Sequence, residues 1–393
     1  MKHLRVQLQP GEVLFREGDD PGTAYLIEAG SVEVRTRQRG HDVVLSLLGP
    51  GELVGEMAVI DDSPRTATAT ATSACTLFPI DRQQIAERLA ATDPIIRSLL
   101  EGQLKRYRGA LAALQGKEPA ADAPSAWEQL GIGKIRLESQ LREALASRQL
   151  ELSYQPLSHI ASSQIAGYEA LVRWNHPERG PVSPAEFVAL AEETSLIVPV
   201  GEYVIDTACE AIAALIAAGH VPAPFVAVNV SARQLSHPGL IERIVARVDA
   251  ASLPRGSLKL EITESQVLDY THVAAIIDLC HVHGIRVALD DFGTGYSHLC
   301  HLHRLPFDTL KVDQSFSRHM LEDKRSMAIV ETIVQLGRAV SAEIVVEGIE
   351  SQAQLEALRR LGCDYAQGYL VGRPRSLDQI LAVDRDRPAQ GLV

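Results

Sequence analysis

The sequence predicts a multidomain protein, with an N-terminal all-β roll with flanking helices and a C-terminal α/β barrel of the TIM type. Three observations lead to this fold class. The chain has 393 residues, more than one ordinary compact domain holds. About the first 80 residues read as short strands with close-set turns. From about residue 135, short apolar runs alternate with amphipathic segments, which is typical of an α/β domain.

Composition narrows the class of protein. Hydrophobic residues make up 46% of the chain, and no stretch approaches the ~20 unbroken apolar residues of a membrane helix. The N-terminal residues lack the apolar block of a secretory signal, so we expect a cytoplasmic protein. A net charge of −12 argues against the basic surface that binds nucleic-acid polymers but permits small anionic ligands. The five scattered cysteines are predicted to be reduced.

The N-terminal domain shows its strands through alternation, most clearly at residues 66–72, where Thr and Ala alternate. From about Arg82 to residue 113, apolar residues recur at helical spacings, which predicts one long connecting helix. Residues 115–133 carry Gly, Pro and Ala with little periodicity. We therefore expect a first domain at 1–113, a linker at 114–133 and a second domain at 134–393.

The C-terminal domain contains enough strands to close a barrel. Eight runs are predicted to be strands, at roughly 151–156, 166–173, 225–230, 257–263, 285–290, 308–313, 343–347 and 364–367. Helices are predicted between them, at 201–218, 240–250, 272–283, 325–340 and 351–361. Eight strands in about 250 residues match a TIM-type barrel. A doubly wound open sheet is the alternative, but no G-x-G-x-x-G follows the first strand.

Polar residues stand on or at the ends of these strands, where packing alone would not select them. They are Glu169, Asn229, Glu261, Asp290, Asp291, Lys311 and Glu347. One acidic residue at a strand end is more often a helix cap or a surface charge, and we assign Asp308 and Asp313 to capping or ion pairs. That explanation would have to hold independently for every member of the larger set. Because active sites of TIM-type barrels gather at the C-terminal ends of the strands, we predict an active site there.

The chemistry of these side chains predicts a metal site. Several carboxylates on one rim raise one another's pKa unless a cation neutralises them. The candidate ligands are hard oxygen donors, which favours Mg²⁺ or Mn²⁺ over Zn²⁺. Asp291 beside Asp290 could let a second ion bind, and two ions could support an in-line phosphoryl displacement by water. The residues alone therefore predict metal-dependent phosphodiester hydrolysis.

A series of motifs in this domain resembles EAL-domain cyclic di-GMP phosphodiesterases. The motifs span about 135–385 in the family's order: Tyr154-Gln155-Pro156, Tyr168-Glu169-Ala170-Leu171-Val172-Arg173-Trp174, Asn229-Val230-Ser231, Leu260-Glu261-Ile262-Thr263-Glu264-Ser265, Asp290-Asp291-Phe292-Gly293-Thr294-Gly295-Tyr296-Ser297, Leu310-Lys311-Val312-Asp313, Glu347-Gly348-Ile349-Glu350 and Gln367-Gly368-Tyr369-Leu370. The resemblance implies hydrolysis of cyclic di-GMP to linear pGpG and a barrel with one antiparallel strand. It also implies a homodimer formed around the loop that begins at Asp290.

The resemblance implies a role for each matched residue. The implied metal ligands are Glu169, Asn229, Glu261, Asp290, Asp291 and Glu347. The implied catalytic residues are Glu169, Lys311, Glu264 and Glu347. Lys311 would position the attacking water, and Glu264 would hold the loop after Asp290. The implied substrate contacts are Gln155, Leu171, Arg173 and Gln367.

The main departure from the family pattern is the segment that contains His298, His301 and His303, where the family usually carries a second Ser and few histidines. The favoured interpretation is a histidine-rich helix surface. Inhibitory Zn²⁺ binding near the loop is the alternative.

A second candidate site lies in the N-terminal domain. A short helix start at Gly55-Glu56-Met57-Ala58 stands close in sequence to Arg65. Free backbone N–H groups suit a phosphate, and Arg65 could add a forked charge-assisted pair, while Glu56 could accept a ribose hydroxyl. The alternative is a surface ion pair between Glu56 and Arg65.

Residues from about 7 to 112 resemble the cyclic-nucleotide-binding domain of catabolite-activator and kinase regulatory proteins. The likeness includes Pro10-Gly11-Glu12 and Glu28-Ala29-Gly30-Ser31-Val32. It implies that Glu56 binds the ribose, and that the cyclic phosphate is surrounded by Gly55, Met57, Ala58, Arg65 and Thr66. Thr66 follows the arginine as in several cGMP-selective relatives, but bacterial prevalence favours cAMP over cGMP.

These features lead to one main hypothesis: a bacterial, metal-dependent cyclic di-GMP phosphodiesterase under allosteric control by a cyclic mononucleotide. A non-catalytic cyclic di-GMP receptor is the alternative, although no catalytic position is missing. A cyclic-nucleotide-responsive DNA regulator is disfavoured by the acidic charge. The sequence leaves open whether the effector activates or inhibits, and which protein partners respond.

Overall fold

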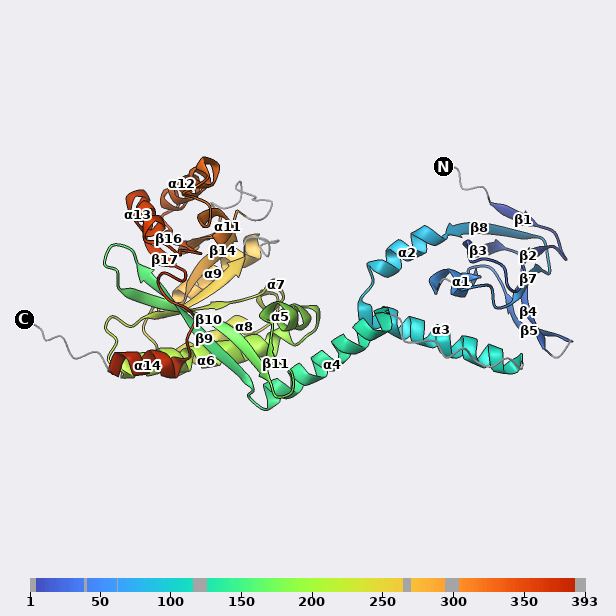
Figure 1. Ribbon diagram of the computed structural model, residues 1–393, viewed down its shortest axis with the longest axis horizontal. Helices are drawn as coiled ribbons and strands as arrows, with labels where there is room; N and C mark the ends of the chain where they lie inside the picture. Colours follow the sequence, from blue (N-terminus) through green and yellow to red (C-terminus); the bar gives the residue numbers. More distant parts are fainter. Residues whose placement is uncertain are drawn as a thin grey trace, which may run out of the picture. The chain divides into compact units, whose positions relative to one another are not determined.

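The computed structural model describes residues 5–38, 41–61, 63–115, 126–263, 270–293 and 304–385. The chain divides into two compact units, residues 1–139 and 140–393 (Figure 1). Each unit is described by itself. No helix among the described residues is both long enough and apolar enough to cross a membrane.

The first unit is an antiparallel β-roll made of two four-stranded sheets. One sheet has the order β1-β8-β3-β6 and the other the order β2-β7-β4-β5. The strands are β1 (Val6–Leu8), β2 (Val13–Phe15), β3 (Thr23–Ala29), β4 (Val32–Gln38), β5 (His41–Leu48), β6 (Leu53–Val54), β7 (Thr68–Ala71) and β8 (Cys75–Asp81). The Thr-Ala alternation forms β7, whose Ala69 and Ala71 are buried with Ile27, Val32 and Leu77. Small alanines on one face let the two sheets approach closely.

The helical stretch of the first unit is broken, contrary to the single helix predicted from about Arg82 to residue 113. The structure contains α2 (Arg82–Ala90) and α3 (Pro94–Leu114). Asp93 accepts hydrogen bonds from the backbone N–H groups of Ile95 and Ile96, and Pro94 stands in the first turn of α3. A proline starts a helix easily but interrupts one in progress, so the Asp93-Pro94 pair explains the break.

The predicted linker at 114–133 is also partly helical, because α4 runs from Ala126 to Ala146. Leu137, Leu141 and Ala144 are buried, and their spacing of three and four residues gives α4 an apolar face. Residues 126–133 of α4 belong to the stretch whose composition suggested a linker. The short α1 (Glu56–Ile60) completes the unit.

The second unit is a closed eight-stranded barrel, which confirms the predicted fold class. Its strands are β9 (Leu150–His159), β10 (Ile165–His176), β12 (Phe225–Asn229), β13 (Leu258–Thr263), β14 (Arg286–Phe292), β15 (Thr309–Val312), β16 (Glu343–Val346) and β17 (Tyr365–Gln367). Strands β10 and β12–β17 pair in parallel in this order. Strand β9 closes the barrel by pairing antiparallel with both β10 and β17. The eight predicted strand positions all coincide with these strands.

Helices cover the outside of the barrel (Figure 1). They are α5 (Pro184–Glu193), α6 (Ile197–Ala217), α7 (Ala232–Leu235), α8 (Leu240–Ala250), α9 (Tyr270–Val282), α11 (Gln314–Ser317), α12 (Lys324–Ala339), α13 (Gln352–Leu361) and α14 (Leu377–Arg385), and β11 (Gly180–Val182) extends the sheet beside β10. Inside, Leu157, Phe225, Ala227 and Val345 form an apolar cluster. The polar residues of the candidate site lie further toward the C-terminal ends of the parallel strands.

Candidate active site and nucleotide pocket

Register places the predicted polar residues next to one another at one end of the barrel. Glu169 of β10 lies opposite Gln155 of β9, and Asn229 of β12 lies opposite Glu261 of β13. Alternation along each strand then directs every second side chain to the interior. Glu169, Glu261 and Lys311 are consequently buried in a domain whose outer strand faces are covered by helices.

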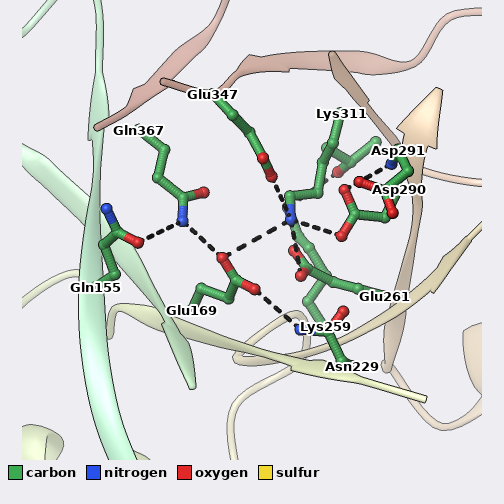
Figure 2. A network of polar contacts seen from close by, with 11 residues as sticks. Gln155, Glu169, Asn229, Lys259, Glu261, Asp290, Asp291, Lys311, Glu347 and Gln367 are labelled. Atoms are coloured by element: carbon green, nitrogen blue, oxygen red, sulfur yellow. Dashed lines mark hydrogen bonds and ion pairs between the residues drawn. The ribbon is translucent and has the colours of Figure 1, made fainter. Parts of the chain in front are cut away.

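Lys311 stands at the centre of the acidic residues (Figure 2). Its ammonium group lies 2.9 Å from Glu261 Oε2, 3.0 Å from Asp290 Oδ2 and 2.8 Å from Glu347 Oε1. Glu169 Oε2 is 3.9 Å away. Only 1% of the side chain of Lys311 is exposed, so these ion pairs are shielded from water. Such close contacts in a low dielectric fix the side chains firmly.

Two amide side chains orient Glu169. Asn229 Nδ2 donates to Glu169 Oε1 at 2.9 Å, and Gln367 Nε2 donates to Glu169 Oε2 at 2.6 Å. Gln367 Nε2 also lies 3.3 Å from Gln155 Oε1. Gln367 Oε1 is buried and has no hydrogen-bond partner among the residues that the structure describes. This side chain therefore presents a free acceptor inside the site.

The surroundings shift the pKa values of the acidic residues in different directions. Burial raises the pKa of Glu169, but Lys311 and the donors Gln367 and Asn229 outweigh it, so the net pKa is lowered. Burial raises the pKa of Glu261 well above its ordinary value, with Lys311 opposing and Glu169 reinforcing the shift. Burial also raises the pKa of Glu347 to about 7. Burial is thus the main cause of the two raised values, and the neighbouring carboxylates add to it.

Lys311 itself is held as a cation. Burial lowers its pKa, but the carboxylates of Glu169, Glu261, Glu347 and Asp290 outweigh burial and raise the pKa well above the ordinary value. Burial raises the pKa of Asp291, and Asp290 adds to the effect. Asp291 also has a left-handed backbone, with φ of 54°, and its N–H donates to Asp290 Oδ1 at 2.8 Å. Such strained backbone is common at functional sites.

The predicted substrate residues line two neighbouring cavities. One cavity is lined by Gln155, Glu169, Asp290, Asp291, Glu347 and Gln367. The other lies against α5 and α6 and includes Leu171, Arg173 and Asn229. A hydrogen bond links Asn229 of the second cavity's lining to Glu169 of the first. The first cavity is polar, whereas the second is walled by apolar residues such as Val188 and Val204.

The structure adds residues that the sequence interpretation missed. Gln314, Arg318, Glu350 and Tyr369 also line the polar cavity. Each lies a few residues after β15, β16 or β17, so its position at the C-terminal rim was a usable signal. Asp308 and Asp313 are confirmed as structural residues. Asp313 caps α11, and Asp308 accepts from Val287 N at 2.7 Å and pairs with His281 at 2.9 Å.

Some predicted residues lie outside the described residues. These are Glu264 and the cluster His298, His301 and His303. Among the residues that the structure describes, no three His, Cys, Asp or Glu side chains are arranged to hold a metal ion. The acidic residues instead direct their oxygens toward Lys311 (Figure 2). The predicted ligand set is brought together without forming a coordination shell.

The N-terminal pocket is built around Arg65, of which 5% is exposed. Its guanidinium lies 4.3 Å from the centre of the Phe15 ring and donates to the carbonyls of Gly55, at 2.5 Å, and Thr23. Within the described part of the chain, Arg65 Nε has no hydrogen-bond partner. The alternative of a surface ion pair with Glu56 is therefore wrong. Burial lowers the pKa of Arg65 and raises that of Glu56.

The structure brings the predicted nucleotide residues together. Gly55, Glu56, Met57, Ala58, Arg65 and Thr66 line one cavity. Tyr107 and Leu111 of α3 line the same cavity and were not predicted. Gly55 has a φ of 80°, and a Cβ at this position would lie 2.5 Å from Arg65 Nη1. Glycine is therefore required there by both backbone conformation and space.

Residues 138–374, more than half of the chain, match the sequence model of the EAL-domain family. The chain belongs to the EAL-domain family. The family model of the cyclic nucleotide-binding domain matches residues 5–92, so this family member carries the second domain that the sequence resembled. Both resemblances seen in the sequence are thereby confirmed.

Solved structures support this combination of domains. The cGMP-bound form of the EAL enzyme Bd1971 is 31% identical, with a TM-score of 0.81 over 97% of this chain and 100% of that one. The form of Bd1971 that binds cAMP and cyclic di-GMP has the same identity, coverage and TM-score. The cyclic di-GMP complex of the PaMucR phosphodiesterase is 42% identical, with a TM-score of 0.60, and covers 62% of this chain and 99% of that one.

Among curated proteins, this EAL-family chain is similar to the bifunctional diguanylate cyclase/cyclic di-GMP phosphodiesterase MucR of Pseudomonas aeruginosa. The two are 42% identical over 250 residues, which is 63% of this chain and 36% of MucR. The cyclic di-GMP phosphodiesterase NbdA of the same species is 37% identical over 62% of this chain and 31% of NbdA. The chain thus spans about a third of the length of these relatives.

Proposed function

We propose that the barrel hydrolyses cyclic di-GMP to linear pGpG. The observation that carries this proposal is the buried convergence of Glu169, Glu261, Asp290 and Glu347 on Lys311 at the C-terminal end of the barrel. Relatives described as cyclic di-GMP phosphodiesterases, and a phosphodiesterase bound to this dinucleotide, support the choice of substrate.

The donor chemistry of the site fits a divalent cation. Four carboxylates lie within 3.9 Å of a single ammonium group, so their formal negative charge exceeds the positive charge of Lys311. The residues that would hold one or two Mg²⁺ or Mn²⁺ ions are Glu169, Asn229, Glu261, Asp290, Asp291 and Glu347. Such ions, when bound, would acidify water and neutralise charge on the phosphoryl oxygens.

The chain's own residues supply binding and proton control. Gln155, Arg173 and Leu171 line the two cavities and would bind the dinucleotide. Gln367 Oε1 would accept a hydrogen bond from it. Lys311, kept protonated by its neighbours, would donate to the attacking water and orient it. Water attacks phosphorus, the bond from phosphorus to O3′ breaks, and O3′ leaves with a proton. The product is linear pGpG with a 5′-phosphate.

A phosphodiesterase assay tests this function. Pure protein is incubated with cyclic di-GMP and Mg²⁺ or Mn²⁺, and the nucleotides are separated by chromatography. We expect pGpG from the wild type, none with excess chelator, and recovery when metal is restored. Glu169→Ala should form no pGpG while retaining the fold by circular dichroism. Intact dinucleotide with the metal-supplied wild type would instead indicate the non-catalytic receptor.

The β-roll is proposed to bind a cyclic mononucleotide that controls the barrel, with cAMP favoured over cGMP. Arg65 carries this part of the proposal, because a buried guanidinium with an unused N–H and only carbonyl partners among the described residues suits a phosphate. The cAMP-bound and cGMP-bound forms of Bd1971 support the ligand class. Calorimetric titration with each nucleotide tests it, and equal or weaker binding of cAMP would overturn the preference.

Two predictions about the whole protein stay predictions. A homodimer is expected from the family resemblance, and sedimentation of the full chain measures it. A cytoplasmic location is expected from the sequence, and fractionation of cells that express the protein measures it.

A further inference from the structure

The helix α3 contacts two parts of the nucleotide pocket through adjacent residues. Tyr107 and Leu111 line the cavity itself. Arg108, next to Tyr107, is not among the lining residues. Its guanidinium instead pairs with Asp61, with Nε 2.5 Å from Oδ2 and Nη2 2.7 Å from Oδ1. Arg108 Nη1 also donates to the carbonyl of Pro64 at 3.3 Å.

The positions of these partners make the contact informative. Asp61 is the C-terminal cap of α1, and Pro64 directly precedes Arg65. Arg108 therefore contacts both Asp61 at the end of α1 and Pro64 beside Arg65. About a fifth of each charged side chain is exposed, at 21% for Arg108 and 19% for Asp61. A two-pronged pair that is mostly shielded from water is stronger than an ordinary surface ion pair.

A ligand in the pocket would compete for the bonds that hold this segment. Arg65 donates to the carbonyl of Gly55, the residue that precedes α1, and to that of Thr23. A phosphate close to Arg65 would draw those donors toward itself, because a charged acceptor forms stronger hydrogen bonds than a carbonyl. The bonds to the two carbonyls would then weaken, and α1 would shift together with Asp61.

We propose that the Asp61–Arg108 ion pair is the connection that transmits occupancy of the nucleotide pocket from α1 to α3. This inference rests on the proposed control of the barrel by a cyclic mononucleotide. It assigns that control to one ion pair outside the binding cavity. Without the pair, ligand would still bind, but α3 would no longer follow α1.

The contacts of α3 continue the path toward its N-terminal end. The C-terminal end of α3 is anchored to the β-roll, because Gln115 Nε2 bonds to Glu17 Oε1 at 3.3 Å and to Thr36. Near the N-terminal end, α3 crosses α4 closely at Gly131. A Cβ on Gly131 would clash with Ser98 and lie 2.7 Å from the carbonyl oxygen of Pro94. Movement of this part of α3 must therefore displace α4.

Helix α4 then leads into the barrel domain. It is continuous from Ala126 to Ala146 and passes the boundary between the two units at residue 139. Strand β9 begins at Leu150, only a few residues later, and carries Gln155 of the candidate active site. The chain itself thus connects α3 to a residue of the polar cavity through one helix and one strand.

The test compares Arg108→Gln and Asp61→Asn with the wild type in the full-length chain. Each variant removes one charge of the pair while keeping a polar side chain. Cyclic mononucleotide affinity is measured by calorimetry, and pGpG formation is measured with and without saturating nucleotide. We expect affinity to stay within about threefold, because neither variant alters a cavity-lining residue. The ratio of the rates with and without nucleotide should differ from one in the wild type and become about one in both variants.

Arg106→Gln is the matched control, because Arg106 lies on the same helix and is exposed. It should bind and respond as the wild type does. Hydrogen exchange gives a readout that does not depend on catalysis. In the wild type and in Arg106→Gln, nucleotide should change exchange in α3 and α4. In the two pair variants, the change should no longer extend to α4, although α3 residues that line the cavity can still respond to the ligand directly.

The outcomes separate this inference from the proposed function. If the wild type responds and both pair variants respond equally, the connection is wrong while the regulation stands. If the pair variants lose nucleotide binding by more than tenfold, Arg108 or Asp61 belongs to the binding site, which also overturns the connection. If the wild type binds nucleotide but neither its rate nor its α4 exchange changes, the proposed regulation fails and the inference fails with it.

Discussion

Two buried cations, Lys311 in the barrel and Arg65 in the β-roll, have opposite surroundings. Lys311 contacts three carboxylates within 3.0 Å, and a fourth lies at 3.9 Å. Arg65 donates to two backbone carbonyls, and its Nε–H has no partner in the described ranges of the chain. The barrel therefore has too much negative charge and suits a cation, whereas the β-roll has an uncompensated positive charge and suits an anion. The proposed metal site and the proposed phosphate site each need one side of this contrast.

The largest expected effect comes from replacing Lys311. Lys311→Met leaves the buried carboxylates without their counter-charge, which typically costs about 3–5 kcal/mol of stability for a buried pair. We also expect kcat/KM for cyclic di-GMP to fall by about 10²–10³-fold, the range for removing one preorganised electrostatic contact. Denaturant unfolding and the phosphodiesterase assay measure the two effects.

Lys259→Met provides the matched control, because Lys259 is equally buried in the same barrel. Its ammonium bonds to Thr309 at 2.9 Å and lies 4.2 Å from the centre of the Phe225 ring, among partners that do not line either cavity. This variant should lose stability but retain most of its activity. Equal loss of activity in both variants would mean that Lys311 acts only through stability.

Arg65 should show the reverse behaviour. Arg65→Met removes a charged donor from the proposed phosphate contact, worth about 1.5–3 kcal/mol, so nucleotide affinity should fall by about 10–100-fold. Stability should fall less than in Lys311→Met, because two backbone carbonyls rather than several buried carboxylates lose their partner. The basal rate of pGpG formation should equal that of the wild type. A large loss of stability with unchanged affinity would show that the arginine is a structural residue and would remove the contrast between the two cations.

Gly55 tests whether the β-roll pocket depends on close packing around Arg65. Gly55→Ala places a residue with a side chain in left-handed backbone, at about 1–2 kcal/mol, and adds a clash with Arg65 Nη1. Gly51→Ala is the matched control, since Gly51 has a φ of 90° but nothing within 4 Å of its Cβ position. Thermal unfolding should show a greater loss for Gly55→Ala. If the two variants lose the same stability, the left-handed backbone alone explains the loss, and close packing around Arg65 contributes nothing.

The smallest expected effects come from helix caps, which give a baseline for both regions. Asp313 caps α11 in the barrel, and Asp93 caps α3 in the first unit. Replacement of either residue by Ala should lower stability by about 1 kcal/mol, the usual value for a lost cap. Local hydrogen exchange measures each helix separately. A markedly larger effect at Asp313 would mean that α11, which carries Gln314 of the cavity, contributes more than a cap.

The sequence predicted the strands better than the helices. The eight barrel strands stand out because buried parallel strands are short apolar runs, each bounded by turn residues. The single helix expected between Arg82 and residue 113 was wrong, because apolar spacing continues across Asp93-Pro94 although the backbone cannot. The helical part of the expected linker was missed because its stabilising residues, Leu137 and Leu141, lie beyond the linker itself.

The sequence by itself determined which residues enter the candidate sites. Strand periodicity directs Glu169, Glu261 and Lys311 to one face of their strands, and motif order identifies the family. Only the tertiary structure decided what those residues contact. Lys311 reaches Glu261 and Asp290 because strands from β13 to β15 pair in one register, and a closed barrel turns their inner faces toward one axis. Arg65 likewise meets Thr23, 42 positions earlier, because the roll folds β3 toward α1. Side-chain convergence depends on pairing between distant segments, which no local pattern specifies.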